Sequence, residues 1–384
     1  MKAAVIAGAT TDFGELWERS PKSLAREALG EALKESNLKK EEIEAIFVGN
    51  MLSGMLGGQE HLGAFFAEAL DISVPAFKIE GACASGGLAF HAGVNGIWSG
   101  QYKAVLVLGV EKMTDFKPEE IATALMGAGS EEERVAGATF PGLYALIASV
   151  HMQKYGTTEE EMASVAVKNH YHASLNGHAQ FRNEITVDQV LGSPKIADPL
   201  KLLDCSPVSD GAAAVILGSE EFIKNKKIIK PVWVKASEVD TDSLGLSGRK
   251  ELTTLDATVK AAKKAYQKAG VKPSEIDIAE VHDCFTIAEI LAMEDLGFYE
   301  KGKAGKAIYK GETRLGNGKL VVNTSGGLKA CGHPVGATGV KQVVEVFKQL
   351  QGKAGRKQVE KAKVGLTQNI GGSGATAVIN IFSV

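Results

Sequence analysis

The stretch KIEGACASGGLAF, residues 78–90, decides the fold. An extended segment enters a turn of small residues that carries Cys83, and a glycine-rich helix follows. A second stretch, ACGHPVGATG at residues 330–339, takes the same course, with His333 in the turn before a glycine-rich helix. Two copies of one unit in a single chain predict two structural halves of the same kind.

A longer repeat extends this prediction outward. Residues 24–48 and residues 254–281 each read as an amphipathic helix, a lysine-rich turn and a strand. In the first copy Ala25, Leu29 and Leu33 recur at helical spacing. Alternating helices and strands in both copies predict an α/β fold of two similar halves, each a mixed sheet flanked by helices.

The boundary between the halves follows from composition. We assign residues 1–225 to the N-terminal half and residues 230–384 to the C-terminal half, because a short basic stretch ending at Pro231 separates them. Residues 115–200 have no counterpart in the second half and are mostly helical and polar. They predict an inserted loop domain on the surface.

Three histidines lie in this insertion, His170, His172 and His178. Since the insertion is polar, we expect their side chains to be solvated.

Composition limits the kind of protein. A net charge of -3 gives no broad electrostatic footprint, so we expect no nucleic acid partner and no membrane surface. No apolar run approaches the roughly 20 residues of a membrane span. The first residues of the chain already have the pattern of a strand, and the four cysteines lack CxxC spacing. Both features indicate a cytoplasmic protein with reduced thiols.

Cys83 is the first candidate for chemistry. Its turn opens a helix, whose unpaired backbone N–H groups favour a thiolate and lower the thiol pKa. Small neighbours leave room for a substrate carbonyl. A buried structural cysteine fits the local sequence equally well.

His333 favours the catalytic interpretation. If a pseudo-twofold axis relates the halves, the turns of Cys83 and His333 face each other at the centre. An imidazole beside a thiol is what a Cys–His nucleophilic pair requires. A histidine that merely caps its helix is the alternative.

His282, Asp283 and Cys284 end the repeated strand of the second half. Ligands of α/β proteins bind at that edge of the sheet, which makes these residues candidates. A zinc site from His282, Cys284, Cys331 and His333 has ligand spacings unlike those of structural zinc sites, so we predict no metal.

A glycine-rich turn, residues 371–374, follows a strand near the C-terminus. Its backbone N–H groups suit an oxyanion. The GxGxxG fingerprint is absent from the first strand and turn, which argues against a nicotinamide enzyme.

Together, three segments resemble the motifs of the thiolase family: GACASG at 81–86, CSPVSDGAA at 205–213 and GHPVGATG at 332–339. The resemblance spans essentially the whole chain. It implies a five-layered fold of two α/β halves with an inserted loop domain, and a homodimer or homotetramer. It also implies coenzyme A thioesters as substrates and no tightly bound cofactor.

Two positions depart from many thiolases. Residues 282–285 read His-Asp-Cys-Phe where Asn-Glu-Ala-Phe is common, and Asn369 stands where a second cysteine is common. The first departure is similar to archaeal and sterol-carrier-protein-type thiolases. In those, the cysteine of this motif, here Cys284, takes the acid/base role.

The resemblance implies an acetyl-CoA C-acetyltransferase that forms acetoacetyl-CoA through an acetyl group on Cys83. His333 would take the Cys83 proton, and Cys284 would deprotonate the second acetyl-CoA. The backbone N–H groups of Cys83 and Gly371 would hold one oxyanion, and His282 with His333 the other. We also expect two residues in the substrate pocket, Met152 and Asn369.

Two other functions stay open from the sequence, a longer-chain 3-ketoacyl-CoA thiolase and a non-catalytic scaffold that binds acyl-CoA. Related archaeal enzymes imply partners as well, 3-hydroxy-3-methylglutaryl-CoA (HMG-CoA) synthase and a small protein with an OB-fold and a zinc ribbon. Such a complex would serve the mevalonate route to isoprenoids.

Overall fold

The structure is a computed structural model, and it describes residues 1–318 and 320–384. Its strands are β1 (Ala3–Thr10), β2 (Ala45–Gly49), β3 (Ala76–Ile79), β4 (Ala104–Glu111), β5 (Lys195–Ala197), β6 (Leu200–Lys201), β7 (Gly211–Ser219), β8 (Val232–Thr241), β9 (Ile278–Glu280), β10 (Val321–Val322), β11 (Val364–Gly371) and β12 (Thr376–Ser383). Its α-helices are α1 (Pro21–Ser36), α2 (Leu62–Leu70), α3 (Ser85–Trp98), α4 (Pro118–Leu125), α5 (Glu131–Val135), α6 (Phe140–Tyr155), α7 (Glu159–Ser174), α8 (Val187–Leu191), α9 (Glu220–Lys226), α10 (Asp256–Ala269), α11 (Thr286–Asp295), α12 (Ala304–Tyr309), α13 (Gly327–Cys331) and α14 (Val335–Gln351).

The strand order repeats between the halves, as the sequence predicts. The first half runs β1-β7-β4-β2-β3 and the second runs β8-β12-β11-β9-β10. In both, the first two pairings are antiparallel and the last two are parallel. The two mixed sheets also meet edge to edge, because Ala4 pairs with Trp233 and Val5 with Val232. The result is one continuous 10-stranded sheet.

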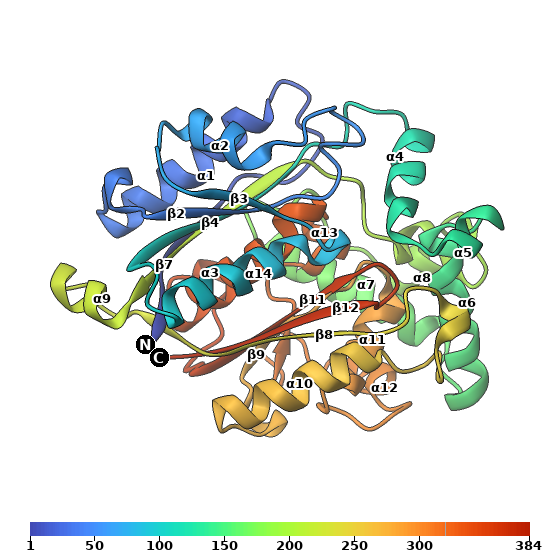
Figure 1. The fold of residues 1–384 in the computed structure, drawn as a ribbon. Helices are drawn as coiled ribbons and strands as arrows, with labels where there is room; N and C mark the ends of the chain where they lie inside the picture. Colours follow the sequence, from blue (N-terminus) through green and yellow to red (C-terminus); the bar gives the residue numbers. More distant parts are fainter. Residues whose placement is uncertain (319) are drawn as a thin grey trace.

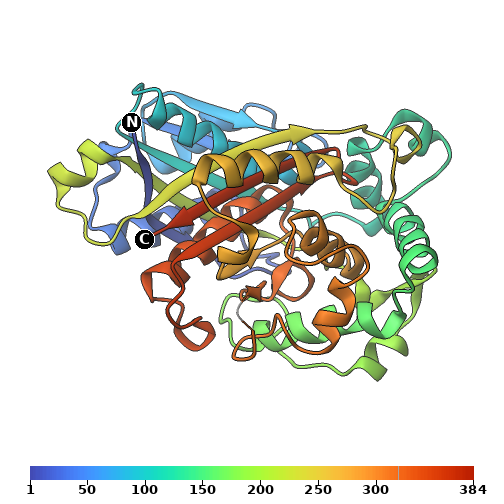
Figure 2. The ribbon, with the colours of Figure 1, turned by 90° about the horizontal axis from the view of Figure 1, so that it is seen from below.

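Helices and sheet regions stack in five layers (Figure 1). Figure 2 looks at the stack from below, with α10 (gold) in front of the second sheet region. Helices α1 and α2 cover the outer face of the first half, and α10 and α11 cover that of the second. Helices α3 and α14 lie between the two sheet regions, and both contribute to the cluster that joins them. Helix α14 is buried along almost its whole length, as expected for a helix with strands on two sides.

Glycines allow this central layer to pack closely. A Cβ on Gly86 of α3 would lie 2.7 Å from the carbonyl oxygen of Gly336 in α14, and one on Gly109 of β4 would lie 2.4 Å from the same oxygen. Both distances are shorter than any real contact, so larger residues there would push the central helices apart. The glycine-rich helix starts therefore set the position of the two turns that precede them.

The inserted segment carries α4 to α8 beside the layered body (Figure 1). One expectation for it is wrong. His170 and His172 are buried, with exposed fractions of 2% and 0%, and only His178 is exposed. The reason is that α7 packs against α11, α12 and α13 of the second half, so its polar residues face other polar residues inside the protein.

None of the helices in residues 1–318 and 320–384 combines the length and apolar character that crossing a membrane requires.

Candidate active site

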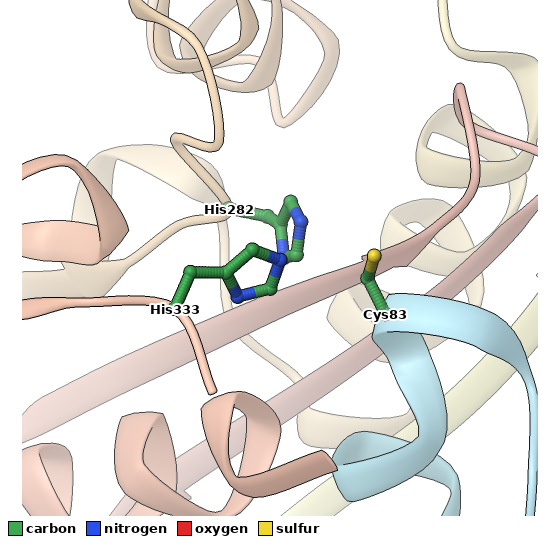
Figure 3. A group of neighbouring side chains, drawn as sticks. All are labelled: Cys83, His282 and His333. Carbon is green, nitrogen blue, oxygen red and sulfur yellow. The ribbon is translucent and has the colours of Figure 1, made fainter. Parts of the chain in front are cut away.

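Three turns from distant parts of the chain meet at one point. Cys83 lies in a single 3-10 turn, Ala82–Ala84, just before α3. His282 follows β9, and His333 lies between α13 and α14. The Cys83 sulfur and one ring nitrogen of each histidine lie within 4.8 Å of one another (Figure 3). The structure thus brings together the thiol and the imidazole that the repeat predicts to face each other.

A strained turn presents Cys83. Ala82 has a φ of 53°, in the left-handed region that costs a residue with a side chain about 1 kcal/mol or more. Ser85 stabilises this turn, because its hydroxyl donates to the Ala82 carbonyl at 2.6 Å and accepts from the Gly81 N–H at 3.0 Å. The turn directs the Cys83 side chain toward the two histidines instead of into the central layer (Figure 3).

The protonation state of Cys83 differs from the sequence-based expectation. Burial raises the pKa of the Cys83 thiol to about 12, and the backbone N–H groups of Gly372 and of Cys83 itself only partly oppose this. The prediction of a thiolate at rest is wrong, since desolvation outweighs the helix-terminal amides. Burial and the charge of Lys341 lower the pKa of His333 to about 3. The resting pair is a neutral thiol and a neutral imidazole.

Thr338 sets the tautomer of His333. The Thr338 hydroxyl donates to the Pro334 carbonyl at 2.9 Å, so its oxygen accepts a hydrogen bond from His333 Nδ1 at 2.7 Å. The ring proton is therefore on Nδ1, and Nε2 has a free lone pair. A histidine in this state is a base toward a nearby thiol.

Cys284 lies in the same cavity as Cys83. Burial and then the neighbouring Cys83 raise the pKa of the Cys284 thiol well above its ordinary value, whereas the Tyr144 hydroxyl acts in the opposite direction. The Tyr144 hydroxyl also lies 3.4 Å from the Gly372 carbonyl. Sequence reasoning missed Tyr144, because nothing in the pattern of α6 distinguishes it from a core tyrosine.

The cavity has a volume of about 230 Å³ and is predominantly apolar. The residues that line it come from both halves and the insertion: Cys83, Met113, Pro118, Ile121, Ala122, Leu125, Thr139, Phe140, Pro141, Tyr144, Cys205, Ser206, Pro207, Val208, Cys284, Phe285, His333, Val335 and Gly372.

Two expected pocket residues do not line this cavity. Met152 of α6 is partly buried and packs against the hydrophobic core cluster that contains residues of α6 and α11. Asn369 is buried behind Cys83, where its side chain amide donates to the Cys83 carbonyl at 3.0 Å. Gly372 replaces Gly371 at the cavity wall, because it is the Gly372 N–H that faces the Cys83 sulfur.

The segment 205–209 connects the turns that carry Cys284 and His333, a role that its motif did not reveal. Ser206 N–H donates to the Cys284 carbonyl at 2.9 Å, and the Ser209 hydroxyl accepts from His333 N–H at 2.9 Å. Strand-like bridges also pair Cys205 with Phe285 and Val208 with His333. The first half therefore holds both turns of the second half in place.

Asp283 joins the same two turns from within the second half. Its carboxylate accepts from Leu328 N–H at 2.6 Å and Lys329 N–H at 3.2 Å, at the start of α13. Asn169 of α7 donates to it at 2.7 Å. Because Asp283 sits between His282 and Cys284 and α13 leads to His333, this carboxylate couples the positions of all three.

A metal is the other ligand that these side chains could hold. Cys83, His282 and His333 offer one sulfur and two nitrogen donors, which are donor types that Zn²⁺ accepts. The set that the sequence suggested is different, since Cys331 lies elsewhere and contacts the Asn176 amide at 3.6 Å. The free thiol and imidazoles are equally the groups of a covalent mechanism.

Comparisons with known proteins identify the family of the chain. The family described as "Thiolase, N-terminal domain" matches residues 3–221, and "Thiolase C-terminal domain-like" matches residues 238–384. An acetyl-CoA acetyltransferase of Methanothermobacter thermautotrophicus is 48% identical over 383 residues, covering 99% of each chain. One of Methanocaldococcus jannaschii is 44% identical, covering 99% of this chain and 98% of that protein.

Among solved structures, the Ltp2–ChsH2(DUF35) aldolase has a TM-score of 0.83 at 22% identity and covers 99% of this chain and 97% of its own. That likeness concerns the fold alone. The family matches together span nearly the whole sequence, and the archaeal relatives match from end to end. The chain belongs to the thiolase family of acyltransferases.

Proposed function

We propose that the protein is an acetyl-CoA C-acetyltransferase that condenses two acetyl-CoA into acetoacetyl-CoA and free coenzyme A, reversibly, through an acetyl group on Cys83. One observation carries the proposal. The Cys83 sulfur lies within 4.8 Å of one ring nitrogen of His282 and one of His333, and Cys284 lines the same cavity. The acetyltransferase names of the archaeal relatives favour acetyl-CoA as the substrate.

The first half-reaction begins from the neutral pair. His333 Nε2 takes the Cys83 proton as the sulfur attacks the thioester carbonyl, so a stable thiolate is not needed. The N–H groups of Cys83 and Gly372 hold the resulting oxyanion, and removal of one such donor typically costs ~10²–10³ in rate. Coenzyme A leaves with the proton of Cys284, and Cys83 carries the acetyl group.

The second half-reaction uses the charges that remain. The Cys284 thiolate removes a proton from the methyl group of a second acetyl-CoA, while N–H donors from His282 and protonated His333 hold the enolate oxygen. The carbanion attacks the acetyl group on Cys83. The Cys83 sulfur is expelled and recovers its proton from His333, so every group returns to its starting state.

Mass spectrometry after mixing with acetyl-CoA tests the first step. We expect one added acetyl group on Cys83 and none in Cys83→Ala. A protein that turns over normally as Cys83→Ala would exclude the mechanism. The absence of any adduct would favour the non-catalytic acyl-CoA-binding scaffold instead.

For the second step, Cys284→Ala should still acetylate Cys83 but lose condensation. Condensation by Cys284→Ala at the wild-type rate would show that another group is the acid/base.

The longer-chain 3-ketoacyl-CoA thiolase is a second candidate, favoured by the size of the apolar cavity, about 230 Å³. A comparison of kcat/KM for acetoacetyl-CoA and 3-ketooctanoyl-CoA separates the two. A higher value for the longer substrate would assign the enzyme to degradation.

We further propose that the product passes to HMG-CoA synthase in the cytoplasm, for the mevalonate route, with a small OB-fold and zinc-ribbon protein between the enzymes. Thiolase equilibria favour cleavage, so synthesis needs a consumer of acetoacetyl-CoA. The Ltp2–ChsH2(DUF35) aldolase, whose fold is similar, pairs two proteins, which favours a protein partner for this fold. A pull-down from native cells that recovers neither partner would contradict this step.

A further inference from the structure

Asn369, near the end of β11, has an amide whose orientation is fixed by two backbone groups. Its Oδ1 accepts from the Gly87 N–H at 3.0 Å, and its Nδ2 donates to the Cys83 carbonyl at 3.0 Å. If the amide were flipped, its NH2 group would face the Gly87 N–H, and its oxygen would face the Cys83 carbonyl oxygen. The side chain is 1% exposed, so water cannot compensate for such a mismatch.

The second hydrogen of the Asn369 amide faces His282. Nδ2 lies 3.2 Å from His282 Nδ1. Because Nδ2 can only donate, Nδ1 must accept, and a neutral ring then carries its proton on Nε2. The ring is neutral because burial, the neighbouring His333 and Lys341 hold the pKa of His282 well below its ordinary value.

The opposite nitrogen has no protein partner in the part of the chain that the structure describes. His282 Nε2 is buried without a hydrogen bond. The His282 and His333 rings lie 5.2 Å apart at 87° to each other, at the same point as the Cys83 sulfur (Figure 3). A buried N–H donor left open in this way is costly for stability, which favours a role toward a bound ligand.

We propose that Asn369 is a positioning residue that locks His282 as its Nε2–H tautomer, so that His282 offers a hydrogen-bond donor to the thioester oxygen of a coenzyme A substrate. The ligand part of this inference rests on the proposed function. The tautomer part rests on the hydrogen bonds alone. Asn369 thereby gives His282 the state opposite to that of His333, whose proton is on Nδ1 facing Thr338.

The two imidazoles thus have separate tasks before substrate arrives. His333 presents a lone pair for the Cys83 proton, and His282 presents a proton for an oxygen that gains negative charge. A single amide side chain holds both the Cys83 turn and this donor, which explains why an asparagine suits position 369. A cysteine there would have no oxygen for Gly87 and no second donor for His282.

Nitrogen-15 NMR of histidine-labelled wild-type protein tests the tautomers directly. We expect His282 to be protonated on Nε2 and His333 on Nδ1, with signals assigned through His282→Asn and His333→Asn. A His282 ring protonated on Nδ1 in the wild type would overturn the inference, whether or not any Asn369 variant folds.

Asn369→Asp is the matched variant, since it has the same shape but no donor. A carboxylate accepts from His282 Nδ1, so the ring proton should move from Nε2 to Nδ1. Asn380→Asp is the control, because Asn380 is equally buried in the adjacent strand, and its amide contacts the Thr367 hydroxyl at 3.0 Å and the Ser237 hydroxyl at 2.6 Å. An unchanged His282 tautomer in Asn369→Asp would contradict the proposed role.

Kinetics give the second readout. In Asn369→Asp the condensation step should fall by ~10²–10³, as for loss of an oxyanion donor, and by at least ~10-fold more than the acetylation of Cys83. Equal losses in both steps would indicate a structural role only. A wild-type protein that acetyl-CoA never acetylates would refute the proposed function while leaving the NMR result intact, so the two failures are distinguishable.

Discussion

At the scale of single residues, the chemistry depends on neighbours that fix where protons lie. Thr338 is fully buried and holds His333 Nδ1 at 2.7 Å. In Thr338→Val, which has nearly the same volume, Nδ1–H loses its acceptor and the ring can turn or change tautomer. We expect acetylation of Cys83 to slow by ~10–100-fold, which is the range lost with one hydrogen bond of about 1.5–3 kcal/mol. Thr338→Ser, which keeps the hydroxyl, should restore most of the rate; failure of this rescue would contradict the assignment.

Tyr144 supports a second residue-scale prediction. Its ring packs on Phe285 with centroids 4.7 Å apart, and Tyr144→Phe keeps that contact while removing the hydroxyl beside Cys284. Because this hydroxyl lowers the pKa of the Cys284 thiol, its loss should raise that pKa. The condensation rate should then reach its maximum at higher pH, whereas the acetylation step keeps its profile.

Tyr266→Phe is the control for this experiment. The Tyr266 hydroxyl is partly buried and donates to the Leu296 carbonyl at 2.9 Å, but Tyr266 does not line the cavity. An identical shift of the pH profile in both variants would remove Tyr144 from the mechanism.

The sequence predicted which residues meet in the site better than it predicted their states. Cys83, His333 and Cys284 follow from the repeat and the motifs, because both report which turns lie at the centre. The pKa of Cys83 was predicted in the wrong direction, since desolvation depends on the groups that pack around the turn from both halves. The contacts of Asn369 reach Gly87 and His282, far away in the chain, and no local pattern reports them.

At the scale of elements, α7 shows how a polar helix becomes interior. His172 of α7 accepts from Leu315 N–H on Nε2, and its Nδ1 contacts the Asn323 carbonyl at 3.0 Å. The first contact needs a neutral ring, because a protonated Nε2 cannot accept, so protonation would break it. Sequence periodicity could not reveal this burial, because the groups that pack against the polar face of α7 belong to α11, α13 and the loops beside them.

This helix predicts acid sensitivity. Burial and the charge of Lys168 lower the pKa of His172 from 6.5 to about 3. Because the pKa of His172 is lower in the folded protein than in the unfolded chain, its contribution to stability is fully present above the unfolded-state pKa. That contribution is lost as the pH falls toward the folded-state pKa. The free energy of unfolding should therefore drop between about pH 6 and about pH 4, with His172 contributing up to ~1.4 kcal/mol per pH unit.

Urea denaturation of His172→Gln across this pH range measures that contribution. The variant should be less stable near neutrality and show a shallower pH slope than the wild type. His61→Gln serves as the control for the loss of an imidazole as such, because His61 is an exposed histidine outside α7. An identical slope in His172→Gln and wild type would mean that other groups cause the acid sensitivity.

At the scale of the whole molecule, the internal repeat was the most informative feature of the sequence. It predicted two halves with the same fold, and the strand orders of the two halves correspond throughout. It did not predict that β1 and β8 pair over two residues to join the halves, because edge pairing depends on how two finished sheets meet. It predicted that Cys83 and His333 meet at the contact between the halves, where the structure has them, so neither half contains the candidate site alone.

The outer edge of the sheet leads to a prediction about assembly. Strand β3 lies at the end of the strand order, and Phe77 in it is 44% exposed while stacking on Phe47 at 5.5 Å. A short open edge with an exposed aromatic residue is suited to pairing with a second copy across a twofold axis.

We expect a dimer of 40.4 kDa chains in light scattering at micromolar concentration. Phe77→Glu should shift it to monomer, since the new charge on the edge strand would have to be buried in the interface. Trp17→Glu, at another exposed aromatic residue (64%), should leave the dimer intact. A monomeric wild type, or a Phe77→Glu protein that remains dimeric, would show that the chain assembles differently. Because β3 leads within a few residues to Cys83, we also expect Cys83 of the monomeric variant to be acetylated more slowly.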